Sequence, residues 1–244
     1  MDKPPNVIVF ETPEQLAETA AQRFVECAAK VDGEVGRFSV ALAGGRTPKR
    51  VYELLATETF SNRINWLQVH LFFGDERSVP PTHPDSNYAM VNEALLSKIA
   101  IPAGNVHRIT GEDEPPKSAT TYETELKTFF AGRDWPRFDL VLLGMGEDGH
   151  TASLFPHSEA LTEKSRWVVA TKYEQTGQNR ITLTLPVINH AAQVVFLVNG
   201  NEKAQRLAEV LRPQPGSEML PAQAVKPVDG SLEWFVDAAA AACL

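Results

Sequence analysis

The segment from Gly144 to Pro156 carries the residues best suited to chemistry. It reads GMGEDGHTASLFP and follows the apolar run 138–143. Its glycines permit positive φ angles, so the loop can curl closely around a ligand. Asp148 and His150 lie two residues apart, and in an extended or tightly turned segment both side chains could point into one cleft. A histidine with a nearby carboxylate suits general acid–base catalysis, and the alternative is a glycine-rich turn whose histidine bonds only to backbone.

A second glycine-containing loop consists of Gly44, Gly45, Arg46, Thr47 and Pro48, between an apolar run and a helical segment. Exposed N–H groups at a helix N-terminus, with Arg46 and Thr47 beside them, suit a phosphate. Thr47 fits the N-cap position and Pro48 the first helical position. The loop matches neither GxxxxGK[ST] nor GxGxxG, so a nucleotide is not indicated. The alternative is an ordinary tight turn with a good cap.

A third loop, residues 74–80, places three consecutive charged residues after an apolar run. Arg77 could bind a phosphate or an oxyanion of the substrate, and Asp75 or Glu76 could hold Arg77 or contact hydroxyl groups. The alternative is a solvated loop in which Arg77 forms a local ion pair. The sequence leaves both interpretations open.

Two later cations could join these loops: Arg180, which begins RITLTL, and Lys203, in NGNEKA. Each taken alone is more often a surface charge than a ligand group. Ser153 lies in TASLF rather than in a GxSxG elbow, so a serine nucleophile is not expected. A metal site and a cofactor are not expected either, because no HExxH or similar cluster occurs. The histidines without metal-ligand spacing are His70, His83, His107, His157 and His190.

Short apolar runs alternate with helical segments along the chain. We expect strands at 7–10, 38–43, 68–73, 138–143, 180–185, 194–198 and 232–236. We expect helices at 12–30, 47–55, 85–96, 117–130 and 201–211, the first with Thr12 as N-cap, Pro13 at N1 and a capping-box Gln15. This alternation predicts βαβ units in a mostly parallel sheet, within one domain spanning 1–244 and with a small antiparallel elaboration around 160–190. Ligands of such sheets bind beyond the carboxyl ends of strands, where the three loops would form a single site.

The composition argues against some partners but does not exclude an anionic small substrate. A net charge of -8 argues against a nucleic-acid partner or an anionic membrane surface. The two cysteines, Cys27 and Cys243, have no metal-ligand spacing and suggest no disulfide framework, which fits a reducing cytosol. The chain shows no signal-like N-terminus and no apolar run of membrane-spanning length. We therefore expect a cytoplasmic protein that is a monomer or a weak homo-oligomer.

Five segments together resemble the 6-phosphogluconolactonase family. They are LAGGRTP, FFGDERSVPPTHPDSNY, LLGMGEDGHTASLFP, NRITLTLPVIN and VNGNEKA, between about residues 40 and 205. The family belongs to a superfamily that includes glucosamine-6-phosphate deaminase. The resemblance implies a Rossmann-like α/β fold of the sugar-phosphate isomerase/deaminase type. It also implies cofactor-free hydrolysis of 6-phosphoglucono-δ-lactone to 6-phosphogluconate in the oxidative branch of the pentose phosphate pathway.

The resemblance also implies roles for individual residues. It makes His150 the catalytic acid/base, with Asp148 beside it. Arg46 stands where many relatives carry serine, so the resemblance favours a phosphate contact from the backbone there. The resemblance further places Gly44, Gly45 and Thr47 at the phosphate. It offers three candidate anion-binding cations: Arg77, Arg180 and Lys203.

Deaminase relatives share the GG-x-TP loop, the Asp-Glu pair and the DGH core, but they differ after the histidine. Their pattern continues with Asn-Glu-Pro where this chain has SLFP, and Arg77 replaces their usual aromatic residue. These departures favour the lactonase. Two alternatives remain: a sugar-phosphate isomerase or deaminase of the same fold, and a non-catalytic sugar-phosphate binding protein.

Overall fold

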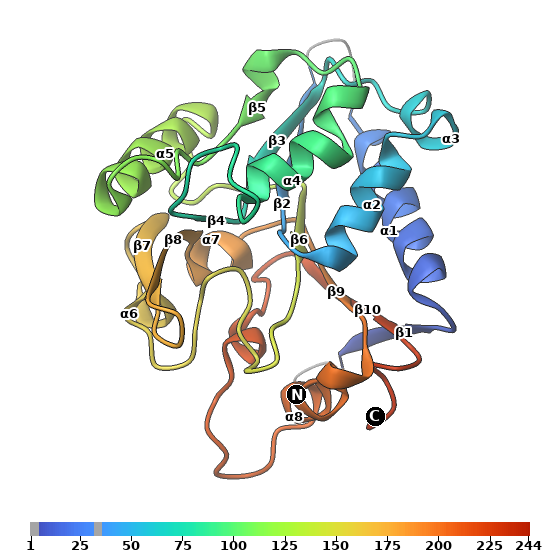
Figure 1. The fold of residues 1–244 in the computed structure, drawn as a ribbon, viewed down its shortest axis with the longest axis vertical. Coiled ribbons are helices and arrows are strands. Elements are labelled where there is room, and N and C mark those ends of the chain that lie inside the picture. Colours follow the sequence, from blue (N-terminus) through green and yellow to red (C-terminus); the bar gives the residue numbers. More distant parts are fainter. Residues whose placement is uncertain (1–4, 32–35) are drawn as a thin grey trace.

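A parallel β-sheet forms the centre of the molecule (Figure 1). The computed structural model describes residues 5–31 and 36–244, and within them seven strands follow the order β1-β10-β9-β6-β2-β3-β5. Every neighbouring pair in this sheet is parallel. The strands are β1 (Asn6–Phe10), β2 (Phe38–Leu42), β3 (Val69–Phe73), β5 (Val106–His107), β6 (Leu140–Leu143), β9 (Gln193–Val198) and β10 (Ser231–Asp237).

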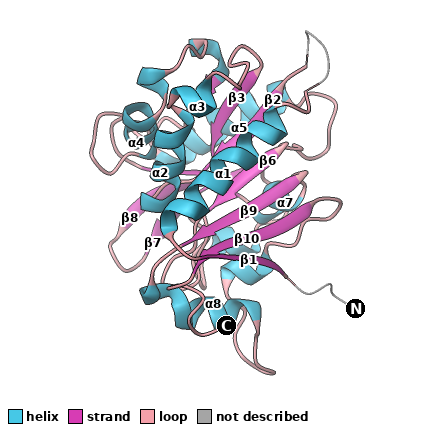
Figure 2. Ribbon diagram, turned by 90° about the vertical axis from the view of Figure 1, so that its right-hand side faces the viewer, coloured by secondary structure: helices cyan, strands magenta, loops and turns pink. Residues whose placement is uncertain are grey.

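The central strands are buried on both faces. Every residue of β2 and β6 is buried, as their mostly apolar sequences predict. Helices α1 (Pro13–Ala28) and α2 (Arg46–Leu55) pack together on one face, and α5 (Pro115–Phe129) lies on the other (Figures 1 and 2). The expectation of a mostly parallel α/β sheet is confirmed.

Local sequence explains where α1 begins but not where α2 begins. Thr12 caps α1 as expected: its hydroxyl accepts a hydrogen bond from the Gln15 N–H at 3.2 Å, and Pro13 follows it. The expectation that Thr47 caps α2 is wrong. Gly45 is the N-cap, with a φ of 101° that favours glycine. Arg46 is the first helical residue, so Thr47 and Pro48 lie inside the first turn, and the expectation of Pro48 at the first helical position is also wrong.

A smaller antiparallel sheet lies beside the main one. It has the order β4-β8-β7, with β4 at Asp75–Arg77, β7 at Val168–Tyr173 and β8 at Gln178–Leu183. This confirms the antiparallel elaboration expected around 160–190. β4 was not expected, because three charged residues do not resemble a strand.

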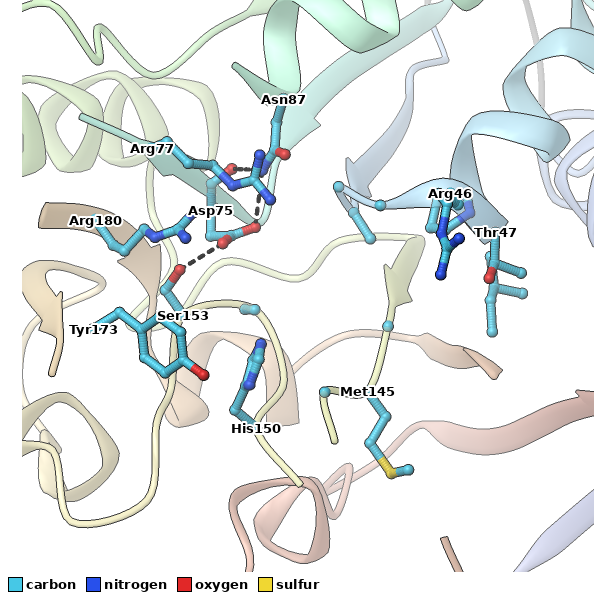
Figure 3. Close-up of a pocket in the computed structure, with 18 of the residues that line it drawn as sticks. Arg46, Thr47, Asp75, Arg77, Asn87, Met145, His150, Ser153, Tyr173 and Arg180 are labelled. Carbon is cyan, nitrogen blue, oxygen red and sulfur yellow. Dashed lines mark hydrogen bonds between the residues drawn. The ribbon is translucent and has the colours of Figure 1, made fainter. Parts of the chain in front are cut away.

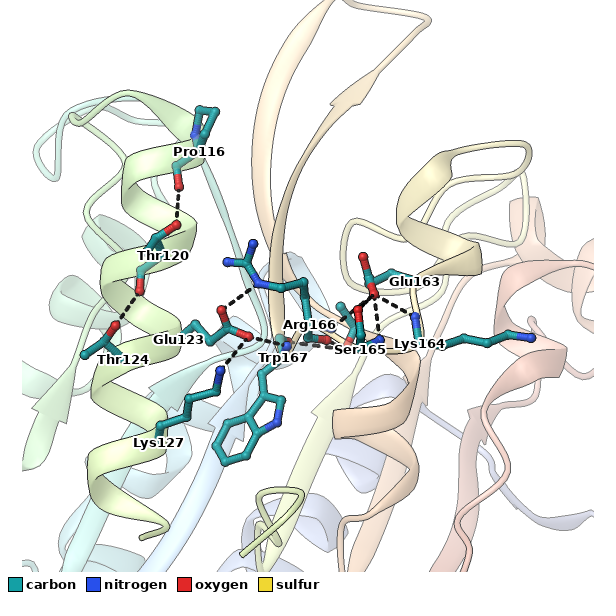
Figure 4. A network of polar contacts seen from close by, with 11 residues as sticks. Pro116, Thr120, Glu123, Thr124, Lys127, Glu163, Lys164, Ser165, Arg166 and Trp167 are labelled. Atoms are coloured by element: carbon teal, nitrogen blue, oxygen red, sulfur yellow. Dashed lines mark hydrogen bonds and ion pairs between the residues drawn. The ribbon is translucent and has the colours of Figure 1, made fainter.

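Buried Glu123 fastens the smaller sheet to α5 (Figure 4). Its carboxylate accepts hydrogen bonds from Arg166 Nε and from the Trp167 N–H, both at 2.7 Å. Lys127 Nζ lies 3.4 Å from the same carboxylate. A buried charge needs such partners, so this network fixes the position of β7 relative to the core.

The remaining helices are short. They are α3 (Glu58–Ser61), α4 (Asn87–Ala94), α6 (Glu159–Thr162), α7 (Leu185–Asn189) and α8 (Ala204–Leu211), with 3₁₀ turns at Leu96–Lys98, Ala103–Asn105, Asn201–Lys203 and Pro221–Ala224. In the part of the chain that the structure describes, no helix is both long and apolar enough to cross a membrane. The expectation of one domain over 1–244 stays a prediction.

The strand order reverses between β2 and β6. From β2 the sheet extends through β3 to β5, and from β6 it extends the other way through β9 and β10 to β1. The loops after β2 and β6 therefore separate at their carboxyl ends and leave a crevice. This is the usual ligand position in open α/β sheets.

Candidate active site

A pocket of about 280 Å³ occupies the crevice beyond β2 and β6 (Figure 3). It brings together the loops 44–48, 74–80 and 144–156 with Arg180 and Lys203. Asp148 does not line the pocket itself but contacts His150, which does. The sequence-predicted residues that line it are Gly44, Gly45, Arg46, Thr47, Asp75, Arg77, His150, Arg180 and Lys203.

Asp148 and His150 form a hydrogen-bonded pair. The distance between Asp148 Oδ1 and His150 Nδ1 is 2.5 Å, and the same oxygen accepts the His150 backbone N–H at 3.1 Å. An ionised carboxylate only accepts hydrogen bonds, so Nδ1 carries the proton and Nε2 is left as a proton acceptor. Burial raises the pKa of Asp148, but the hydrogen bonds and charge of His150 outweigh it and hold that pKa below its ordinary value. The pair can therefore act as an oriented base.

The loop from 144 to 150 curls tightly to create this pair. The Gly146 N–H donates to the His150 carbonyl at 2.9 Å, and the Gly149 N–H donates to the Gly146 carbonyl at 3.0 Å. A Cβ on Gly146 would lie 2.2 Å from the His150 ring and 2.8 Å from Asp148 Oδ1. Gly149 has a φ of 82°. These two glycines permit the turn that the sequence alone left undecided.

The N-terminus of α2 forms one side of the pocket. Thr47 donates its hydroxyl proton to Asn199 Oδ1 at 2.6 Å, which ties the start of α2 to the end of β9. Lys203 donates to the Met145 carbonyl at 2.5 Å, and burial lowers the pKa of its ammonium group. The Arg46 side chain is 96% exposed and lies 4.0 Å from a Glu202 oxygen. Backbone N–H groups, rather than Arg46, are therefore the donors best placed for an anion here.

The smaller sheet forms the opposite side, where Arg77 and Arg180 stand in directly opposed positions of β4 and β8. The Nε atoms of both are buried and lack a hydrogen-bond partner among the described residues. Arg77 also donates through Nη1 to the Asp85 carbonyl. Burial, and then the charge of Arg77, lower the pKa of Arg180. Two adjacent cations with unused donors are suited to an anionic ligand.

Alternation along β4 separates the two carboxylates of this loop. Asp75 accepts from the Ser153 hydroxyl at 2.5 Å and from Asn87 Nδ2 at 3.2 Å, on the pocket side. Glu76 instead accepts from the N–H groups of Asn87 and Tyr88 at the N-terminus of α4. Burial raises the pKa of Glu76, although these N–H groups oppose the rise. Glu76 thus holds α4, and neither carboxylate bonds to the Arg77 guanidinium.

Among the further pocket residues that were not predicted for the site from the sequence, four have polar or aromatic side chains: Asn87, Ser153, Phe155 and Tyr173. The first three lie within the motifs DSNY and SLFP, which carried a usable signal. Tyr173 lies in no motif. Its ring stacks on Phe155 with 4.4 Å between centroids and lies 5.9 Å from the His150 ring.

The arrangement has a defined chemical capacity. An oriented base shares one pocket with a helix N-terminus and three cations, so water could be activated beside a bound anionic small molecule. Ser153 bonds to Asp75, which makes it a scaffold for the pocket wall. Within residues 5–31 and 36–244, no group of three or more His, Cys, Asp or Glu side chains could hold a metal ion. Fold and site together define an α/β enzyme for small anionic substrates.

Comparisons with known proteins give the family. The family model described as glucosamine-6-phosphate isomerases/6-phosphogluconolactonase matches residues 11–234, and the chain belongs to this family. It is 46% identical to a 6-phosphogluconolactonase of Nostoc sp. over 85% of each chain. It is 43% identical to that of Synechocystis sp. over 96% of this chain and 95% of the relative. A 6-phosphogluconolactonase structure from Trypanosoma cruzi superposes with a TM-score of 0.88 at 32% identity, covering 100% of this chain and 98% of that one.

Proposed function

We propose that the protein is a 6-phosphogluconolactonase, which hydrolyses 6-phosphoglucono-δ-lactone to 6-phosphogluconate. The Asp148–His150 pair carries this proposal, because its base faces a pocket that also holds an anion-binding helix N-terminus. Relatives named 6-phosphogluconolactonase at 43–46% identity support the same activity. A δ-lactone is an activated ester, so its hydrolysis requires no covalent nucleophile.

The chemistry follows from the two nitrogens of one ring. His150 Nε2 removes a proton from water while the water oxygen attacks the lactone carbonyl carbon C1. The carbonyl electrons move to oxygen and form a tetrahedral intermediate. As this collapses, the bond from C1 to the ring oxygen breaks, and the imidazolium returns its proton to that oxygen. Asp148 stabilises the imidazolium, and general acid–base catalysis of this kind contributes about 10²–10⁴-fold.

The phosphate and the lactone end of the substrate fit the two sides of the pocket. The phosphate lies against the backbone of the Gly44–Thr47 loop and Lys203, which supplies binding energy remote from C1. Arg77 and Arg180 provide further anion contacts, to the phosphate or to the oxygen that becomes negative in the intermediate. Asp75 fixes the pocket wall between these arginines and Ser153.

The test is a lactone hydrolysis assay corrected for spontaneous hydrolysis, with His150→Ala as the informative variant. We expect kcat/KM to fall by about 10²–10⁴-fold. His157→Gln is a matched control, because His157 lies in the following turn with 70% of its side chain exposed. Near-native activity of His150→Ala would refute the assignment of the base. Release of ammonia from glucosamine 6-phosphate would instead support the deaminase alternative.

A further inference from the structure

The loop 144–150, which we term the His150 loop, is held from outside by the C-terminal part of the chain. Three of its carbonyls, at alternate positions, accept hydrogen bonds from residues 203–222. Met145 accepts from the Lys203 ammonium group at 2.5 Å. Gly149 accepts from the Ala222 N–H at 3.0 Å. Glu147 accepts from Arg206 Nε at 3.0 Å. Of the three donors, Arg206 alone is a side chain that does not line the pocket.

The Arg206 contact lies next to the acid–base pair. The Glu147 carbonyl belongs to the peptide group that precedes Asp148, and the Gly149 N–H, which donates to the Gly146 carbonyl at 3.0 Å, belongs to the one that follows it, so both neighbouring peptide groups are hydrogen-bonded. The Asp148 carboxylate must stay 2.5 Å from His150 Nδ1 to keep the ring oriented. A rotation of the peptide at Glu147 would move that carboxylate directly. Arg206 therefore acts on the geometry of the base without touching the pocket.

The alternative is that Arg206 merely forms a helix-surface ion pair. Its Nη1 does lie 2.6 Å from Glu209 Oε2, three residues along α8. The Nε donor is directed elsewhere, to the His150 loop, and the planar guanidinium fixes both directions at once. The ion pair with Glu209 therefore uses a different donor from the bond to Glu147. Because α8 is anchored by buried Ala204, Leu207 and Val210, the donor is carried on a rigid element.

We propose that Arg206 is a positioning residue for the reaction: through the Glu147 carbonyl it holds Asp148, and thereby the His150 ring, in the orientation required of the base. This inference rests on the proposed function. The residue before α8 is Lys203, which lines the pocket and bonds to the same loop. The start of α8 therefore joins the anion-binding side of the pocket to the acid–base pair.

The test compares Arg206→Ala with two controls. We expect kcat of Arg206→Ala to fall by about 10- to 100-fold with KM little changed, since small displacements of catalytic groups have effects of this size. Glu209→Gln removes the ion pair but keeps the Nε bond, and Arg212→Ala removes a charge just beyond α8. Both controls should retain wild-type kcat. Arg206→Lys, which can reach only one of the two acceptors, should recover part of the activity. An Arg206→Ala enzyme with the kcat of the controls would overturn the inference.

A spectroscopic measurement separates positioning from stability and does not depend on turnover. A short hydrogen bond to a carboxylate strongly deshields its proton, so the His150 Nδ1 proton should give a far-downfield ¹H NMR signal in wild type. We expect Arg206→Ala to lose or shift this signal. Arg206→Lys should keep part of it, and this variant serves as the test if Arg206→Ala folds poorly. An unchanged signal in Arg206→Ala would overturn the inference. A wild-type protein without lactonase activity would contradict the proposed function alone, and the signal would still decide the role of Arg206.

Discussion

Arg77 and Arg180 face each other across β4 and β8, each with a buried Nε that lacks a partner among the described residues. Like charges in directly opposed strand positions repel each other, so this arrangement is unfavourable unless an anion joins it. The nearby carboxylates do not neutralise the pair by direct hydrogen bonding, because Asp75 bonds to Ser153 and Asn87. The wall of the pocket is thus prepared for a negative ligand.

Loss of either arginine should weaken substrate binding. We expect Arg77→Ala and Arg180→Ala each to raise KM by about 10- to 100-fold, the size of a lost hydrogen bond to a charged group. A lower kcat with unchanged KM would instead place that arginine at the oxyanion. Steady-state kinetics on freshly prepared lactone distinguish these outcomes. Arg133→Ala, which removes an exposed arginine that does not line the pocket, should behave as wild type.

Gly146 should tolerate no side chain. Gly146→Ala places a methyl group 2.2 Å from the His150 ring, so the ring must move away from Asp148. We expect kcat/KM to fall by about 100-fold, a loss typical of a misplaced catalytic group. Gly104→Ala is the control, since a Cβ there meets nothing within 4 Å. Kinetics together with the melting temperature check the prediction, and a fully active Gly146→Ala enzyme would show that the loop can relax.

The ring of Tyr173, rather than its hydroxyl group, should matter for catalysis. Its hydroxyl donates to Gln175 at 2.6 Å in the hairpin turn, whereas its ring packs on Phe155 beside His150. We therefore expect Tyr173→Phe to keep kcat/KM near wild type and Tyr173→Ala to lower it by about 10-fold, as loss of an aromatic contact implies. Equal losses in both variants would assign the role to the hydroxyl.

Glu163 should make folding stability depend on acid pH. Backbone N–H groups, first that of Ser165, lower the pKa of Glu163 to about 2 (Figure 4). A depressed carboxyl pKa stabilises the folded state above the unfolded value of about 4.3, and this stabilisation is lost as the pH falls toward 2. Because the group is partly exposed to solvent, we expect Glu163→Gln to cost only about 1 kcal/mol at pH 7.

Urea unfolding at pH 7 and near pH 2.5 measures this dependence. The difference in unfolding free energy between wild type and Glu163→Gln should shrink at the lower pH. Glu18→Gln, an exposed position on α1, should show no comparable change. A difference that stays constant between the two pH values would contradict the assigned cause.

Much of the fold could be predicted because its signals are local. The apolar runs that became β2, β6 and β9 are buried on both faces, and burial of both faces selects uninterrupted apolar sequence. The cap of α1 likewise involves residues three apart. The strand Asp75–Arg77 escaped prediction, because its pairing with β8 depends on residues about 100 positions later in the chain.

By itself, the sequence determined the order of most elements, the three strand-end loops and the residue types that they carry. Only the tertiary structure decided which of those side chains meet. It joined Ser153 to Asp75, placed Tyr173 beside His150 and directed Arg206 to the His150 loop. Such contacts depend on where separate elements cross, and the energy that fixes the crossing comes from burial of the whole core rather than from any one segment. The 2.5 Å contact between Asp148 and His150 depends on the turn formed with Gly146 and Gly149, which the two-residue spacing alone does not fix.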